Sequence, residues 1–63
     1  MKLEGLFLWG VPLRGSDESL WITTKRNCIH TALRKANRFL SRNRRRYPRV
    51  SVRGVQSHGT LDA

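Results

Sequence analysis

The sequence predicts a small α+β domain, in which a three-stranded sheet is covered on one face by a single basic amphipathic helix, in the order β-β-α-β. The chain has 63 residues, which is enough for one domain with one core (1–63). Apolar residues make up 38% of the chain and include two Trp and two Phe, which separates it from disordered sequences. The spacing of these residues is strand-like, then helix-like, then strand-like again.

The first predicted strand covers residues 3–13. This segment is too short for a stable helix, and its aromatic and glycine residues favour a buried strand. Because apolar residues occupy both alternating faces, the strand is expected at the centre of the sheet, which gives the strand order 2-1-3. Pro12 is expected to end its ladder or to lie at an edge. One face would carry Leu3, Phe7, Trp9 and Val11, and the other Leu6 and Leu8.

The second predicted strand covers residues 19–23 and follows a turn at 14–18 that contains Gly, Ser and Asp. The two strands would form a hairpin. Leu20 and Ile22 point to one face and Trp21 to the other. If the first two face the helix, Trp21 lies on the open face of the sheet.

A helix is predicted over residues 24–45, with Thr23 or Thr24 as its N-cap. Pro48 must end it. Within the helix, Leu33, Ala36, Phe39 and Leu40 are expected to be buried against the first strand. The apolar residues recur every three or four positions, as in an amphipathic helix: Cys28, Ile29, Ala32, Leu33, Ala36, Phe39 and Leu40.

The third predicted strand covers residues 49–56, where Val50 and Val52 alternate with polar residues. Gly54 would mark a bulge or a close backbone approach. The last residues, 60–63, are expected to be a tail or a brief extension.

The positive charge forms one continuous block. The net charge is +9, yet residues 25–53 alone carry eleven Lys and Arg and no acid. Such a block attracts polyanions. Guanidinium groups bind phosphate and carboxylate in bidentate fashion. The candidate residues for binding nucleic acid or an acidic partner are Arg34, Lys35, Arg38, Arg42, Arg44, Arg45, Arg46, Arg49 and Arg53.

No catalytic or metal site is predicted. Asp17 and Glu18 are adjacent in a turn and do not form an acid–base pair. Cys28 and His30 lie two residues apart on the predicted helix, so their side chains point in different directions. Cys28 is therefore expected to be a core residue. The chain is expected to be non-enzymatic, with no cofactor, and its single cysteine allows no internal disulfide.

Two functions remain open. The first is nucleic-acid binding, mainly through phosphates. The alternative is a small phage-type inhibitor or adaptor that binds an acidic surface of a larger host protein. The β-β-α-β layout and small size are similar to those of several compact phage proteins, a likeness of architecture without a shared motif. Leu6, Leu8 and Trp21 would form a protein interface, either with such a partner or in a homodimer.

The apolar run at residues 6–11 is too short to cross a bilayer. Glu4 near the start and Pro12 after the run do not fit a signal peptide. A cytoplasmic protein without a membrane span is therefore expected.

Overall fold

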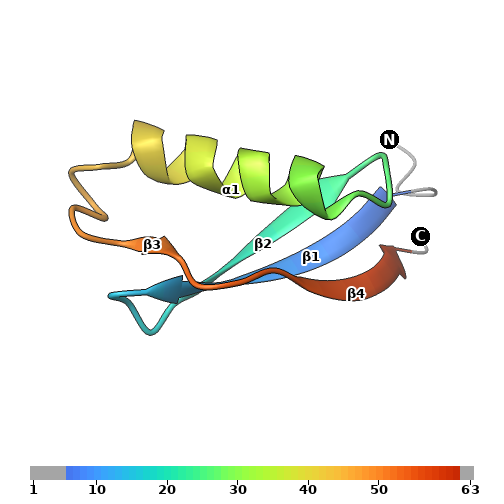
Figure 1. The fold of residues 1–63 in the computed structure, drawn as a ribbon, viewed down its shortest axis with the longest axis horizontal. Helices are drawn as coiled ribbons and strands as arrows, with labels where there is room; N and C mark the ends of the chain where they lie inside the picture. Colours follow the sequence, from blue (N-terminus) through green and yellow to red (C-terminus); the bar gives the residue numbers. More distant parts are fainter. Residues whose placement is uncertain (1–5, 62–63) are drawn as a thin grey trace.

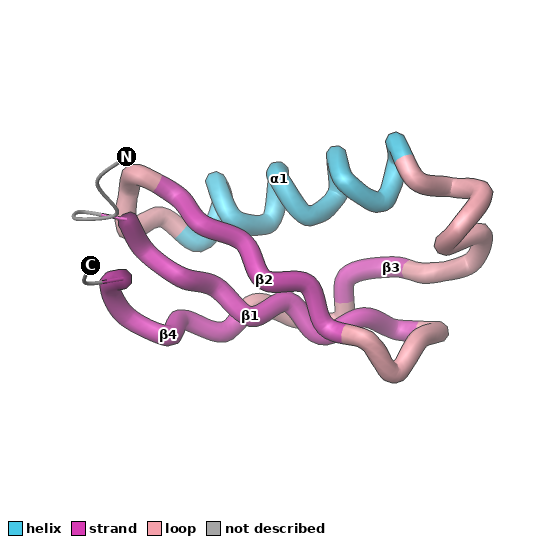
Figure 2. The backbone as a smooth tube through the Cα atoms, turned by 180° about the vertical axis from the view of Figure 1, so that it is seen from behind, coloured by secondary structure: helices cyan, strands magenta, loops and turns pink. Residues whose placement is uncertain are grey.

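The computed structural model describes residues 6–61, which form an antiparallel sheet and one helix. Figure 1 shows the helix lying along one face of the sheet, and Figure 2 shows the same two layers from behind. The small α+β class is therefore confirmed. The elements are β1 (Leu6–Arg14), β2 (Ser19–Thr24), α1 (Ile29–Arg42), β3 (Ser51–Val52) and β4 (Gln56–Leu61).

Strand β1 is the centre of the sheet, as its apolar faces predicted. It pairs with β2 along one edge, where Trp9 lies opposite Ile22. Along its other edge it pairs with β3 near Leu13 and with β4 between Leu6 and Gly10. All three pairings are antiparallel. The order β2-β1-β3 was predicted correctly, and Leu3 lies outside the described residues.

The third strand differs from the predicted 49–56 segment, because the chain forms two strands, β3 and β4, with a break at residues 53–55. The registers of the two strands place this break opposite Val11 and Pro12. Proline has no N–H to donate to a ladder. Only the Pro12 carbonyl takes part, accepting from the Arg53 N–H at 2.9 Å. The sheet therefore has four strands rather than three.

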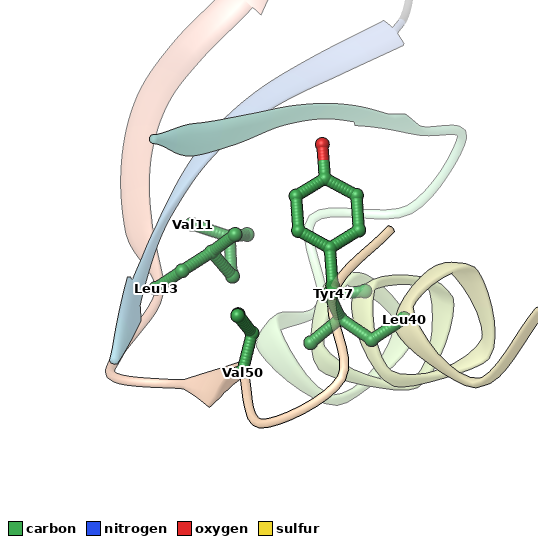
Figure 3. Packing of buried hydrophobic residues seen from close by; sticks show 6 residues of the cluster. Val11, Leu13, Leu40, Tyr47 and Val50 are labelled. Atoms are coloured by element: carbon green, nitrogen blue, oxygen red, sulfur yellow. The ribbon is translucent and has the colours of Figure 1, made fainter. Parts of the chain in front are cut away.

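The core lies between α1 and β1 and is closed by the segment that follows the helix. Figure 3 shows Val11 and Leu13 from β1 facing Leu40 from α1, with Tyr47 and Val50 beside them. All five side chains are buried. Leu20, Ile22, Val52 and Val55 pack around this cluster.

The helix begins at Ile29, five residues later than predicted, because Thr24 belongs to β2. The Thr24 side chain is buried, and its Oγ1 accepts a hydrogen bond from Trp9 Nε1 at 2.8 Å. The same hydroxyl donates to the Arg26 carbonyl at 2.6 Å, which turns the chain toward the helix. Thr24 is thus a strand residue that satisfies a buried indole, and it does not cap the helix.

The helix ends at Arg42, three residues earlier than predicted. Asn43 is the C-cap, and its side-chain amide donates to the Phe39 carbonyl at 2.8 Å. The N–H groups of Arg46 and Tyr47 then both donate to the Asn43 carbonyl. Asn side chains compete with the helical backbone in this way, so the chain turns before it reaches Pro48.

The buried stripe of α1 is narrower than predicted. Ala32, Ala36 and Leu40 are buried, whereas Leu33 is 36% exposed and Phe39 is 39% exposed. At about 100° per residue, the first three lie within about 40° of the stripe's centre and the other two about 60° to either side. The expectation that Leu33 and Phe39 are core residues is therefore wrong. They lie on the flanks of the helix.

This stripe leads us to expect different costs for the same substitution at two helix positions. Leu40→Ala empties a fully buried position and should lower the free energy of unfolding by about 2–5 kcal/mol. Leu33→Ala, at a partly exposed position, should cost less than half as much. Urea denaturation followed by circular dichroism measures both. Equal losses would contradict the orientation of α1.

The Trp9–Thr24 contact gives a second expectation. Thr24→Val keeps the shape of the side chain but leaves the buried indole N–H without an acceptor, which should cost about 1–3 kcal/mol. Thr24→Ser, which keeps the hydroxyl, is the control and should cost less. If the two variants have the same free energy of unfolding, the hydrogen bond does not contribute.

Candidate nucleic-acid interface

The outer side of α1 carries the basic residues farthest from the sheet. Arg34 and Arg38 lie about 160° around the helix from Ala36, the centre of the buried stripe. Arg42 lies between this outer side and the flank above β2. From Arg34 to Arg42 the helix rises about 12 Å, at 1.5 Å per residue. We call these three residues the arginine row, and all three are exposed.

Lys35 belongs to the flank rather than to this row. Its Nζ donates to the Thr23 carbonyl of β2 at 2.8 Å. The ammonium group therefore helps to hold α1 against the edge strand β2, although the side chain as a whole is exposed. Lys35 is the candidate that most clearly combines a structural contact with its charge.

The Arg44–Arg46 triplet does not extend the arginine row, since the helix ends before it. Arg45 lies in the turn after Asn43, although the helix predicted over residues 24–45 included it. Arg44 donates from Nη1 to the Val50 carbonyl at 3.1 Å. The Arg46 guanidinium lies 5.5 Å from the centroid of the Tyr47 ring, within the range of a cation–π contact. Two of the three therefore also stabilise the connection to β3.

The remaining candidates, Arg49 and Arg53, lie near the β1–β2 turn, which carries acidic residues. Arg53 and Asp17 line the same surface opening, and Arg49 shares the neighbouring one with Glu18. Gly15 in this turn has a φ of +92°, and a Cβ there would lie 2.8 Å from the Arg49 carbonyl oxygen. Carboxylates partly cancel the positive charge at this end of the molecule, so the positive potential is stronger along α1.

Glu18 is held by a hydrogen bond across the structure. The Tyr47 hydroxyl donates to Glu18 Oε2 at 2.8 Å. This hydrogen bond, together with burial, raises the pKa of Tyr47 above its usual value. The pair links the turn before β2 to the segment after α1.

The Tyr47–Glu18 contact should be visible in an alkaline titration. Because folding raises the pKa of Tyr47, this contribution to stability is complete below about pH 10 and is lost as the pH rises through the folded-state pKa. The chain has one tyrosine, so absorbance of tyrosinate reports on it alone. Glu18→Ala should lower the titration midpoint, whereas Asp17→Ala, which removes the same charge nearby, should lower it less. Equal shifts would mean that general electrostatics, and not the hydrogen bond, perturbs Tyr47.

Cys28 is the N-cap of α1, so its expected place in the core is wrong. It is half-buried, and its side chain makes no capping hydrogen bond. The neighbouring backbone N–H and hydroxyl of Thr31 and the N–H of His30 lower the pKa of the thiol. Cys28 was expected inside the helix because the predicted helix began at residue 24, whereas α1 begins at Ile29.

The predicted protein-interface residues lie on the other side of the molecule. Alternation along the strands places Leu6, Leu8 and Trp21 on the face of the sheet that α1 does not cover. Trp21 is 63% exposed and the two leucines are half-buried. The ring of His58, which was not a candidate, lies 4.9 Å from that of Trp21. Sequence analysis missed His58 because the segment around it was not predicted to be a strand.

Within residues 6–61, no group of three or more His, Cys, Asp or Glu side chains is arranged to hold a metal ion. In the same part of the chain, α1 is too short and too polar to span a membrane. Comparisons with protein-family models, curated proteins and solved structures gave no match to this chain.

Proposed function

We propose that this chain is a non-enzymatic binding protein that uses the arginine row of α1 to bind nucleic acid through its phosphates. The observation that supports this most directly is the combination of exposure and charge. Arg34, Arg38 and Arg42 are exposed on a helix that contains no acidic residue, within a 25–53 segment that also contains none. Among residues 6–61, these three guanidinium groups make no hydrogen bond of the kind that Lys35 and Arg44 make.

The geometry suits a phosphate backbone. A duplex carries about one negative charge per 1.7 Å of axis, so a row about 12 Å long faces several phosphates at once. Packing of the buried stripe fixes α1 on the sheet, so the row is organised before it binds. Contacts of this kind determine affinity and register but carry no sequence information. Binding should therefore be largely independent of sequence and strongly dependent on salt.

The alternative, an inhibitor or adaptor on an acidic protein surface, has one observation in its favour. Phe39, 39% exposed, lies on a flank of the same helix, and Ile29, 49% exposed, is its first residue. A phosphate backbone offers these side chains no apolar partner, whereas a protein surface would. On such a surface one or two residues would dominate the affinity.

The test is a salt titration of binding to random-sequence duplex DNA and RNA by fluorescence anisotropy. Wild type is compared with Arg38→Gln and with Arg14→Gln, which removes an equal charge from the end of β1. If Arg38 contacts a phosphate, Arg38→Gln should flatten the slope of log K against log salt by about 0.9 for a B-DNA duplex. Arg14→Gln should change the slope much less.

The outcomes separate the two functions. Equal changes for both variants would show that the net charge, and not the arginine row, is responsible. Failure of the wild type to bind either nucleic acid at low salt would contradict the proposal, since an exposed arginine row should bind at least non-specifically. The acidic-protein alternative would then take its place.

A further inference from the structure

Strand β2 forms an edge of the sheet, since within residues 6–61 it pairs with β1 alone. The direction of its outward backbone groups follows from Pro12, whose carbonyl accepts from the Arg53 N–H on the other side of β1. Ser19 lies opposite Pro12, so these two residues form no hydrogen bond with each other. Because backbone groups alternate in direction along a strand, Ser19, Trp21 and Thr23 all point their N–H and C=O groups away from β1. Such groups are a template for a further strand.

One of these outward groups has a partner on α1. The Thr23 carbonyl accepts from Lys35 Nζ at 2.8 Å, which agrees with the direction inferred for Thr23. In the described part of the chain, the N–H and C=O groups of Ser19 and Trp21 have no partner across the free edge. The middle of this edge is therefore open to an incoming strand.

A groove runs along the same edge, between β2 and α1. Leu20 and Ile22, both half-buried, line it from the strand, and Phe39, 39% exposed, lines it from the helix. Leu20 and Ile22 pack against the core, so they lie on the helix-facing side of β2, opposite to the side chain of Trp21. A strand added to β2 would direct every second side chain toward Phe39.

The charge differs between the two ends of this groove. Past the last residue of β2 it meets a second opening lined by Lys25, Arg26 and Lys35, with no carboxylate among the described residues around it. At the other end lies Glu18, whose carboxylate already accepts a hydrogen bond from the Tyr47 hydroxyl. An occupant with negative charge at the first end and apolar side chains in the middle is therefore complementary to the groove.

Backbone pairing and charge together select a peptide as the occupant. Nucleic acid has the negative charge but lacks the alternating N–H and C=O groups that pair with a strand edge. A second copy that paired through its own β2 would bring a net charge of +9 and the same three cations to this edge. An extended acidic segment of another protein meets both requirements.

We propose that an extended acidic segment of another protein adds to the free edge of β2 as a further antiparallel strand, with apolar side chains in the groove beside Phe39. Strand addition is a recurring mode of peptide recognition. Antiparallel pairing, as in the rest of the sheet, places the N-terminal end of the segment beside Lys25 and Arg26, so its acidic residues precede its apolar ones. Lys35 then exchanges the Thr23 carbonyl for an acidic side chain. No member of the arginine row lines this groove, so the inference is independent of the proposed function.

The probe is a fluorescein-labelled peptide in which three glutamates are followed by alternating valine and threonine, and fluorescence anisotropy measures its binding to nuclease-treated protein. Residues that share hydrogen bonds with Ser19, Trp21 and Thr23 lie on the sheet face away from α1. With the valines in the groove, the threonines therefore point their N–H groups to β2 and the valines point theirs to solvent. N-methylation of the threonines should weaken binding by about tenfold or more. N-methylation of the valines, at equal charge and composition, should weaken it much less.

Variants of the protein test the groove and its cationic end separately. Phe39→Ala should weaken peptide binding, whereas Leu33→Ala, 36% exposed on the opposite flank of α1, is the matched control. Lys25→Gln should also weaken it. Arg14→Gln, which removes an equal charge at the opposite end of the sheet, should have much less effect.

Circular dichroism melting establishes that each variant is folded, and Lys25→Gln, at an exposed position, keeps the test if Phe39→Ala unfolds. Amide hydrogen exchange gives an independent reading, since the Trp21 N–H should exchange fast in the free protein and slowly with the peptide bound. Absence of binding at low salt would overturn the proposal. So would equal losses from the two N-methylated peptides, equal effects of Lys25→Gln and Arg14→Gln, or a dimer through β2, seen by sedimentation equilibrium, that excludes the peptide.

Discussion

The packing of α1 against the sheet is the constraint on which the other features depend. Two of the three buried helix residues are alanines, Ala32 and Ala36, and the larger Leu40 fills the space near Val11 and Leu13. Small side chains bring a helix near a sheet but bury only a narrow stripe of it. Leu33 and Phe39 therefore remain on the flanks, and the opposite side of the helix is left for the arginine row.

This packing gives the molecule two different surfaces on opposite sides. One side presents a rigid helix with guanidinium groups and no carboxylates. The other presents the sheet face that α1 does not cover, where Trp21 is 63% exposed.

The sequence predicted the features that depend on local pattern. Alternation was enough to place β1 at the centre and Trp21 on the open face. The three-and-four spacing was enough to predict a helix between β2 and β3, but not its ends or its buried stripe. The errors concern segments whose structure depends on contacts with residues distant in the sequence. Thr24 looks like a helix cap until Trp9, fifteen residues earlier, is seen to use its hydroxyl. Strand β4 has little apolar alternation, and it forms because β1 offers a free edge beyond Pro12. The arginine row ends at Arg42 because Asn43 caps the helix there. The arginines that follow Asn43 favour a longer helix, which is why the predicted helix extended to residue 45.

The separation of the two surfaces can be measured directly in one experiment. Amide proton–nitrogen NMR spectra of the labelled protein would be recorded while a short random-sequence duplex is added. We expect shifts in the signals of residues 34–46, with the indole N–H of Trp21 unchanged, because that ring lies on the face away from α1. Shifts of the Trp21 indole and of the β2 amides, with the α1 signals unchanged, would contradict it and would place the nucleic acid on the sheet.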